Sequence, residues 1–169
     1  MENKIAIVAS MTLAIIGSIC LSAPEIANAK TKTTSSTTLL AQNQCRINQF
    51  ENRVFQLTNS IRQSNGLRPL KWNCRLIMAA KNHSQDMAKI NRMSHSGSDG
   101  STIAMRAKRV GYRYSYLAEN VAAGQRSPEQ VVDDWMKSPG HRQNILNPNI
   151  TEIGVGFYNQ YWTQVFGSK

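Results

Sequence analysis

One stretch decides the fold of this chain: residues 135–166, WMKSPGHRQNILNPNITEIGVGFYNQYWTQVF. It opens inside a helix, and the Ser138-Pro139-Gly140 turn that follows leads into a His-Arg pair. It closes with segments 153–158 and 161–166, which alternate with period two around Asn159-Gln160 and predict a β-hairpin. With the helices predicted upstream, this hairpin indicates an α+β fold.

Working outward, four helices are predicted where apolar residues recur at helical spacing: 50–64, about 75–91, 102–110, and one that starts at Pro128. The last helix has the clearest start, because Ser127 suits the N-cap, Pro128 the first helical position, and Gln130 a capping box. Arg68 to Trp72 is an extended connection, and a strand is expected near 116–121. We therefore expect a small central antiparallel sheet with about four helices packed on it.

The first 29 residues have the features of a secretory signal peptide. Lys4 supplies positive charge, Ile5 to Leu21 is almost wholly apolar, and Ala27-Asn28-Ala29 has the small-x-small pattern of a cleavage site. A transmembrane anchor is the alternative, but the apolar run is marginal for spanning a bilayer. We predict cleavage after Ala29, no stable membrane anchor, and a location outside the cell, in the periplasm or at the cell envelope.

Residues 30–49 are rich in serine and threonine and have no core-forming pattern, so they are predicted to be a disordered linker before a domain at 50–169. Removing residues 1–29 takes one lysine and two glutamates from totals of 20 basic and 10 acidic residues, which leaves a formal charge of +11. This charge favours anionic partners. Export argues against nucleic acid as the partner, which leaves acidic lipid headgroups or wall polymers. The alternative is that the basic surface is only solvated and aids solubility. The oligomeric state is not determined by the sequence.

Two cysteines, Cys45 and Cys74, remain after the predicted cleavage. An even count in an exported protein is compatible with one disulfide. Such a bridge would tie the tail before the first helix to the start of the second helix.

Three polar segments carry the residues that could do chemistry. His95 lies in the glycine-containing stretch 94–97, where a ligand could approach the backbone closely, and His141 follows a Pro-Gly turn. Glu119 lies in an apolar, strand-like run, where a carboxylate needs a polar partner. His83 differs, because it lies on the apolar stripe of the second helix and is predicted to be a structural histidine.

Two histidines and one carboxylate permit two kinds of chemistry. They can ligate Zn²⁺ or another divalent cation and leave one position open for water. Alternatively, the carboxylate can orient a histidine that acts as a general base. The sequence contains no His-Glu-x-x-His, Gly-x-Ser-x-Gly or Cys-x-x-Cys motif and no phosphate loop. The spacing of these residues leaves both kinds of chemistry open.

Five motifs occur in an order that resembles the CAP superfamily (cysteine-rich secretory, antigen 5, pathogenesis-related 1), and most closely its bacterial branch: SHSG, AENVAAG, WMKSPGHRQNILNP, EIGVGF and YWTQVFG. The resemblance implies a secreted α-β-α sandwich with a central cleft. In the better-known members that cleft holds two histidines and two acidic residues, and some of them bind a divalent cation there. By this resemblance the first histidine corresponds to His95 and the first acid to Glu119.

The chain departs from the family pattern at the other two positions. Tyr161 stands where the second histidine would be, and Lys137 and Ser138 occupy the region of the second acid. His141 could replace the missing histidine in space. The predicted ligand-binding cleft therefore consists of His95, Glu119, His141, Asn144 and Tyr161, and of these His95, Glu119 and His141 are the candidates for catalysis or metal binding.

The resemblance implies two functions from different classes. One is an exported binding module whose cleft holds a wall component or a lipid-like small ligand. The other is a hydrolase of envelope polymer, such as peptidoglycan, or of peptides, using the same cleft. A hydrolase needs an activated water or nucleophile, and the sequence displays neither unambiguously, which favours the binding module.

Overall fold

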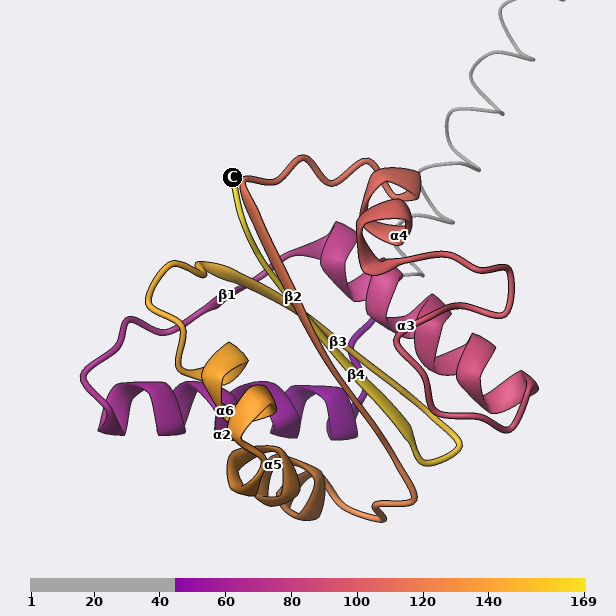
Figure 1. Ribbon diagram of the computed structural model, residues 1–169. Coiled ribbons are helices and arrows are strands. Elements are labelled where there is room, and N and C mark those ends of the chain that lie inside the picture. The colour runs from indigo at the N-terminus through magenta and orange to yellow at the C-terminus, as the bar shows by residue number, and fades with distance from the viewer. Residues whose placement is uncertain (1–44) are drawn as a thin grey trace, which may run out of the picture. The chain divides into compact units, whose positions relative to one another are not determined.

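The computed structural model describes residues 45–169, and the predicted signal peptide and most of the predicted linker lie outside the described residues. This part contains five helices and four strands, which are labelled in Figure 1. The helices are α2 Gln49–Ser64, α3 Cys74–Lys89, α4 Ile103–Arg109, α5 Pro128–Lys137 and α6 Pro139–Ile145. The strands are β1 Lys71–Trp72, β2 Tyr116–Ala123, β3 Glu152–Tyr158 and β4 Tyr161–Ser168. None of the described helices is long and apolar enough to cross a membrane.

The strands form one sheet in the order β1-β3-β4-β2. The predicted hairpin is confirmed: β3 and β4 pair antiparallel, and the turn residues Asn159 and Gln160 both have positive φ, as a two-residue hairpin turn requires. β2 pairs antiparallel with the other side of β4. The sheet differs from the prediction at one edge, where the extended connection forms β1 and pairs parallel with β3, so the sheet is mixed.

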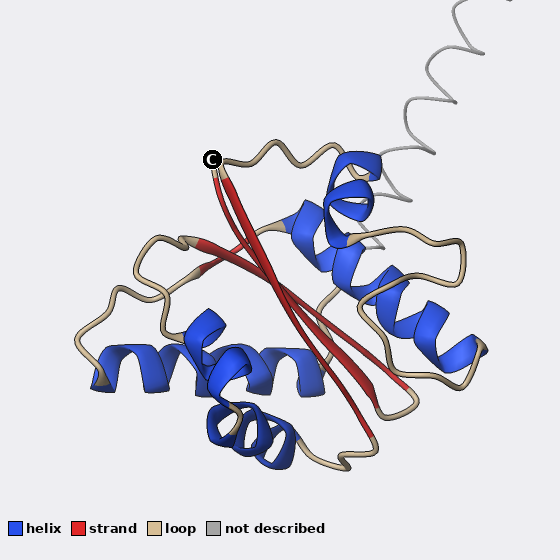
Figure 2. Ribbon diagram, viewed as in Figure 1, coloured by secondary structure: helices blue, strands red, loops and turns tan. Residues whose placement is uncertain are grey.

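The helices cover the two faces of this sheet in separate groups (Figure 2). Helices α2, α5 and α6 contribute to the larger apolar cluster, which includes Trp135, Ile145 and Phe166. Helices α3 and α4 contribute to a smaller cluster with Leu76 and Val165. This arrangement confirms the predicted α+β class and its α-β-α layers, with the sheet between two helical layers.

Helix α3 lies directly on the backbone of β3. A Cβ atom at Gly154 would overlap with the backbone of Leu76, and one at Gly156 would overlap with the backbone of Ala80. Ser84 reinforces this contact, because its Oγ donates to the carbonyl of Gly156 at 3.1 Å. The two glycines therefore fix how closely α3 and the residues that it carries approach the sheet.

Ordered structure begins before the predicted domain start at residue 50. Asn48 caps α2, because its side chain accepts from the Glu51 amide at 2.9 Å while the Glu51 carboxylate accepts from the Asn48 amide at 2.9 Å. The predicted Cys45–Cys74 disulfide is present, with a Cα–Cα distance of 5.4 Å. Residues 45–49, which were assigned to the linker, therefore belong to the folded part of the chain.

The segment around the Ser-Pro-Gly sequence differs from the prediction. Ser127 caps α5 as expected, but Gln130 accepts from the amide of Arg126 and not from that of the N-cap, so the capping box is incomplete. The predicted turn at 138–140 is instead the start of α6, in which Pro139 occupies the first position, where a missing N–H costs nothing. His141 therefore lies in the first turn of a helix.

Candidate functional site

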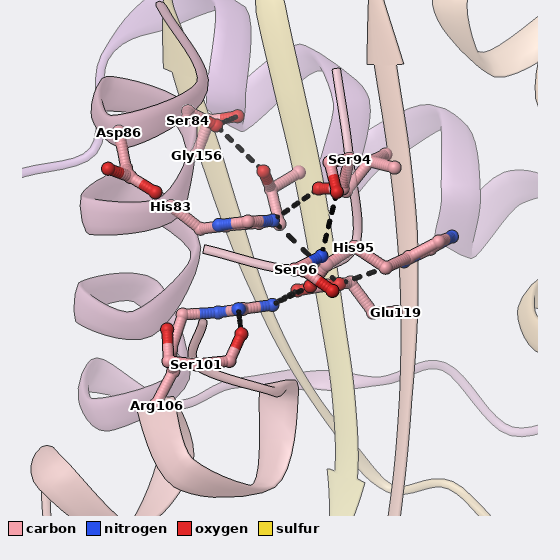
Figure 3. A network of polar contacts seen from close by, with 12 residues as sticks. His83, Ser84, Asp86, Ser94, His95, Ser96, Ser101, Arg106, Glu119 and Gly156 are labelled. Atoms are coloured by element: carbon pink, nitrogen blue, oxygen red, sulfur yellow. Dashed lines mark hydrogen bonds and ion pairs between the residues drawn. The ribbon is translucent and has the colours of Figure 1, made fainter. Parts of the chain in front are cut away.

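Glu119 is the centre of a polar network on the edge strand β2 (Figure 3). Its side chain is only 2% exposed, and it points toward the layer formed by α3 and α4. An isolated carboxylate at such a position would cost several kilocalories per mole. The side chains of Arg106 and His95 supply the polar partners that Glu119 needs, and His83 lies behind them.

Arg106 of α4 supplies the opposite charge. Its Nη2 lies 2.7 Å from Glu119 Oε2, and the side chain is 8% exposed. The same guanidinium donates to two backbone carbonyls, that of Ser101 at 2.8 Å and that of His95 at 3.0 Å. Arg106 therefore neutralises Glu119 and also fixes the loop between α3 and α4 that carries His95.

His95 binds the other oxygen of Glu119. Its Nδ1 lies 2.9 Å from Glu119 Oε1, and because an ionised carboxylate only accepts, Nδ1 carries the proton. The hydrogen bond to Glu119 raises the pKa of His95 above its ordinary value, with burial and Arg106 opposing the rise. The side chain is 61% exposed. The network thus holds one exposed imidazole in a fixed orientation, with Nε2 left for other partners.

His83 lies behind this pair in α3. It is buried, as predicted for a structural histidine, and its Nε2 donates to the Ser94 carbonyl at 2.8 Å. It also lies close to the site, because Nε2 is 4.0 Å from Glu119 Oε1. Burial lowers the pKa of His83, although the charge of Glu119 acts in the opposite direction.

Helix α6 approaches the open edge of β2. Asn144 donates from Nδ2 to the backbone carbonyl of Glu119 at 3.2 Å and to Asn120 Oδ1 at 2.9 Å. Asn120 in turn donates to the backbone carbonyl of His141 at 3.2 Å. These bonds anchor α6, and with it His141, beside the strand residue that holds His95.

His141 is half-buried, and its pKa is lowered by burial and by the charge of His95. The bond from Asn120 places the backbone of His141 beside β2, while His95 reaches Glu119 from the α3–α4 loop. That the two imidazoles share one cleft stays a prediction.

Tyr161 lies farther along the same sheet. It pairs with Ala123, four residues along β2 from Glu119, which corresponds to about 13 Å of strand. Its hydroxyl donates to Asn91 Oδ1 at 2.8 Å. Tyr161 thus holds the end of α3 to the hairpin and makes no contact with Glu119, so its place in a ligand site stays a prediction.

The arrangement does not fit a resident divalent cation. Within residues 45–169, no group of three or more His, Cys, Asp or Glu side chains is placed to hold a metal ion. Both oxygens of Glu119 already bind nitrogen atoms, and one of those belongs to the positively charged Arg106. A cation at Glu119 would have to compete with that guanidinium at close range.

Two members of the network, Arg106 and His83, were not among the predicted site residues. A signal for Arg106 exists in the sequence, since it lies three residues after Ile103 and four before Val110, on the apolar stripe of its helix. A cation in that position needs a buried anion, and Glu119 is an anion in an apolar run. For His83 no comparable signal exists, because its contact with the site depends on how α3 packs on the sheet.

Comparisons with known proteins agree with this architecture. Residues 55–166 match the Cysteine-rich secretory protein family, CAP. The uncharacterized protein YkwD of Bacillus subtilis (strain 168) is 45% identical over 126 residues, which cover 73% of this chain and 49% of YkwD. The chain therefore spans about half the length of this relative.

Two solved structures share the fold. An extracellular protein containing a SCP domain from Bacillus anthracis str. Ames has a TM-score of 0.69 and 34% identity, covering 70% of this chain and 40% of that chain. A cysteine-rich secretory protein from Staphylococcus aureus has a TM-score of 0.63 at 24% identity, covering 73% of this chain and 40% of that chain, and this likeness supports the fold alone. With the family match, the order of its motifs and the layered fold in agreement, this chain belongs to the CAP superfamily of cysteine-rich secretory proteins.

Proposed function

We propose that this chain is an exported CAP domain protein that binds a wall component at the surface formed by His95, Glu119 and His141. One observation carries the proposal: a buried carboxylate–guanidinium pair, Glu119 and Arg106, holds an imidazole that is 61% exposed. Burying an ion pair brings little net stability. The network holds one exposed imidazole in a fixed orientation. We therefore infer that it serves to bind a ligand and not to stabilise the fold.

Several features support export. The first 29 residues have the pattern of a cleavable signal peptide, and the Cys45–Cys74 disulfide fits an oxidising compartment. The relative from Bacillus anthracis is described as extracellular. For an exported chain of this positive charge, an anionic wall polymer is the favoured partner, and a lipid-like small ligand at the same surface is the alternative.

Hydrolysis of peptidoglycan or peptide is the second candidate function. The observation that favours it is the His95 Nδ1–Glu119 bond, because a carboxylate that orients an imidazole leaves Nε2 free to act as a general base. Within residues 45–169 no hydroxyl or thiol is hydrogen-bonded to the ring of His95, so the base would have to activate a water molecule. Binding does not require an activated water molecule, and it is therefore the function that we favour.

The test uses the mature chain, residues 30–169, with purified peptidoglycan. Co-sedimentation measures binding, and chromatography of the supernatant detects released fragments, with and without EDTA. The variants are His95→Ala and His141→Ala, and the matched controls are their exposed neighbours, Ser96→Ala and Gln143→Ala.

Binding without release that both histidine variants lose, and both controls keep, supports the binding function. Release of fragments that the same variants lose supports the hydrolase. If the wild-type chain neither binds nor releases fragments, or if the histidine variants behave like the controls, the proposed site is wrong for this polymer.

A further inference from the structure

A groove of about 670 Å³ lies between two loops next to β1, away from the residues that hold His95. One wall belongs to segment 66–71, which leads from α2 into β1, and the other to segment 148–152, which leads into β3 (Figure 1). Ligand sites in proteins commonly have volumes of about 300–1,000 Å³. This loop groove, as we call it, is therefore large enough for a small molecule or for a segment of a polymer.

The loop groove has a surplus of positive charge. Three basic side chains line it, Arg68, Lys71 and Lys169, against the single acidic side chain of Glu152. The groove between α2 and α5 is the opposite case, because it is lined by two acidic side chains and no basic one. A concave surface with one sign of charge concentrates the field and attracts ligands of the other sign.

The one acidic side chain of the loop groove is already bound. Glu152 Oε2 accepts from the Tyr112 hydroxyl at 2.6 Å, and Oε1 accepts from Asn73 Nδ2 at 2.9 Å. Oε1 is also 3.7 Å from Lys169 Nζ. The other two basic side chains of the groove make no ion pair within residues 45–169. Their charges are therefore available to an anionic ligand.

A buried arginine joins the two walls from behind. Arg62 of α2 is 1% exposed, and its Nε donates to the Arg68 carbonyl at 3.0 Å. Its Nη atoms donate to the carbonyls of Ile145, Asn147 and Ile150. In the described part of the chain Arg62 makes no ion pair, although burying a cation without an anion is costly. Arg62 therefore fixes both walls and adds an uncompensated positive charge next to the groove.

The shape of this surface favours a soluble ligand over a lipid bilayer. Proteins that lie on a bilayer bury protruding apolar side chains in it. The exposed large apolar side chains in the part of the chain that the structure describes are Ile47, Ile90, Met93, Met105 and Tyr158. None of them lines the loop groove. A ligand enters this groove, and no apolar side chain projects from it into a membrane.

We propose that the loop groove is a binding site for an oxyanion, phosphate or carboxylate, carried on a soluble polymer or a fragment of one. The guanidinium of Arg68 can bind two oxygen atoms of such a group at once, and Lys71 adds a point charge. The apolar rings of Pro69 and Pro148 line the same groove and suit the uncharged part of the ligand. The proposal does not rest on the proposed function, because it uses neither His95 nor His141.

The test is an NMR titration of the ¹⁵N-labelled mature chain with glycerol phosphate, with glucuronate, and with uncharged glycerol for comparison. We expect saturable shifts of the Gly66, Lys71 and Thr151 amides with at least one of the two anions. Glycerol should give none. High ionic strength should weaken the binding of the anion, because salt screens charges on an open surface.

The decisive variants are Arg68→Gln and Arg113→Gln, which remove the same charge from the chain. Both side chains are exposed, so neither change should alter the thermal unfolding midpoint, and Arg113 lies outside the groove. Losing a charge-assisted contact should weaken anion binding about tenfold in Arg68→Gln. Arg113→Gln should bind the anion like the wild type.

Three results would overturn the proposal. If neither anion gives saturable shifts of these amides, or if glycerol gives the same shifts, the loop groove is not an oxyanion site. If both glutamine variants weaken binding equally, the net charge of the chain attracts the anion and the groove has no part in it. If the chain sediments with phosphatidylglycerol vesicles and binds neither soluble anion, the partner is a membrane. The peptidoglycan test stays separate, because it reads His95→Ala and His141→Ala.

Discussion

The two faces of the central sheet use buried side chains in different ways (Figure 2). On the face covered by α2, α5 and α6, Trp135, Trp162 and Phe166 are buried in one large apolar cluster, and the buried Arg62 of α2 donates only to backbone carbonyls. On the face covered by α3 and α4, the apolar cluster is smaller, and Glu119, Arg106 and His83 are buried beside it. We therefore expect the first face, with the larger apolar cluster, to supply more of the stability, whereas the second face holds the ion pair and the histidines around Glu119.

The largest expected effect is on the apolar face. Trp135 is 1% exposed and its Nε1 donates to the Val121 carbonyl at 3.3 Å. Trp135→Ala should lower the free energy of unfolding by about 3–5 kcal/mol, because it empties a large site in the core. Denaturant titration measures this change, and a loss below about 1 kcal/mol would show that this face is not the main source of stability.

A similar loss is expected on the polar face for a different reason. Arg106→Met removes the guanidinium and leaves the buried Glu119 without its opposite charge, which costs about 3–5 kcal/mol. Arg109→Met is the matched control on the same helix, because the Arg109–Asp99 pair is exposed and such pairs contribute at most about 1 kcal/mol. Equal losses in the two variants would show that Arg106 has no special role.

The disulfide ties the first residue of α3 to the segment just before α2. Replacing Cys45 and Cys74 together by serine opens a loop with a sequence separation of 29 residues, and the loop-entropy relation gives a loss of about 3–4 kcal/mol. The double variant should unfold at lower denaturant concentration than the wild type. Under reducing conditions the two proteins should become alike, and a difference that persists would argue against the bridge.

The two histidines on Glu119 should give opposite pH dependences. The pKa of His83 is lowered, so its contribution to stability is present above about pH 6.5 and is lost as the pH falls through its folded value. The pKa of His95 is raised, so its contribution is present below about pH 6.5 and is lost as the pH rises through its folded value.

Stability measured between pH 5 and pH 8 in His83→Gln and His95→Gln separates these two contributions. Relative to the wild type, His83→Gln should lose less stability on acidification, and His95→Gln should lose less on the approach to neutral pH. If the pH dependence of stability shifted in the same direction in both variants, relative to the wild type, the buried and the exposed histidine would not differ as predicted.

The smallest effect is expected for the exposed ring itself. His95→Ala should change the free energy of unfolding by no more than about 1 kcal/mol, the usual range for a side chain outside the core, because water can replace it at Glu119. Its effect on ligand binding should be large by comparison. A loss of stability as large as that of Trp135→Ala would mean that His95 is a structural residue.

Much of the fold could be predicted from periodicity. The apolar repeat of α2, the Ser127–Pro128 start of α5 and the alternation on both sides of Asn159 all led to the correct elements. The helix α6 was missed because Pro139-Gly140 is as typical of a turn as of a helix start. The strand β1 is only two residues long and exists through pairing with β3, which no local pattern indicates.

The candidate site could be predicted only in part, for a similar reason. His95 and Glu119 were found because each residue is unusual in its own segment, and their 2.9 Å contact agrees with that expectation. Arg106 could have been found from its place on the apolar stripe of α4, whereas His83 resembles any buried histidine. That both meet Glu119 follows from the packing of α3 and α4 on the sheet, which local sequence does not reveal.

Glu119, held by Arg106, orients an exposed His95 and raises its pKa. NMR titration of the three histidines of the chain tests this claim most directly. The structure predicts one histidine, His95, with a pKa above 6.5 and two, His83 and His141, below it, and a return of His95 toward 6.5 in Glu119→Gln. Three pKa values at or below 6.5, or an unchanged His95 in that variant, would contradict the account.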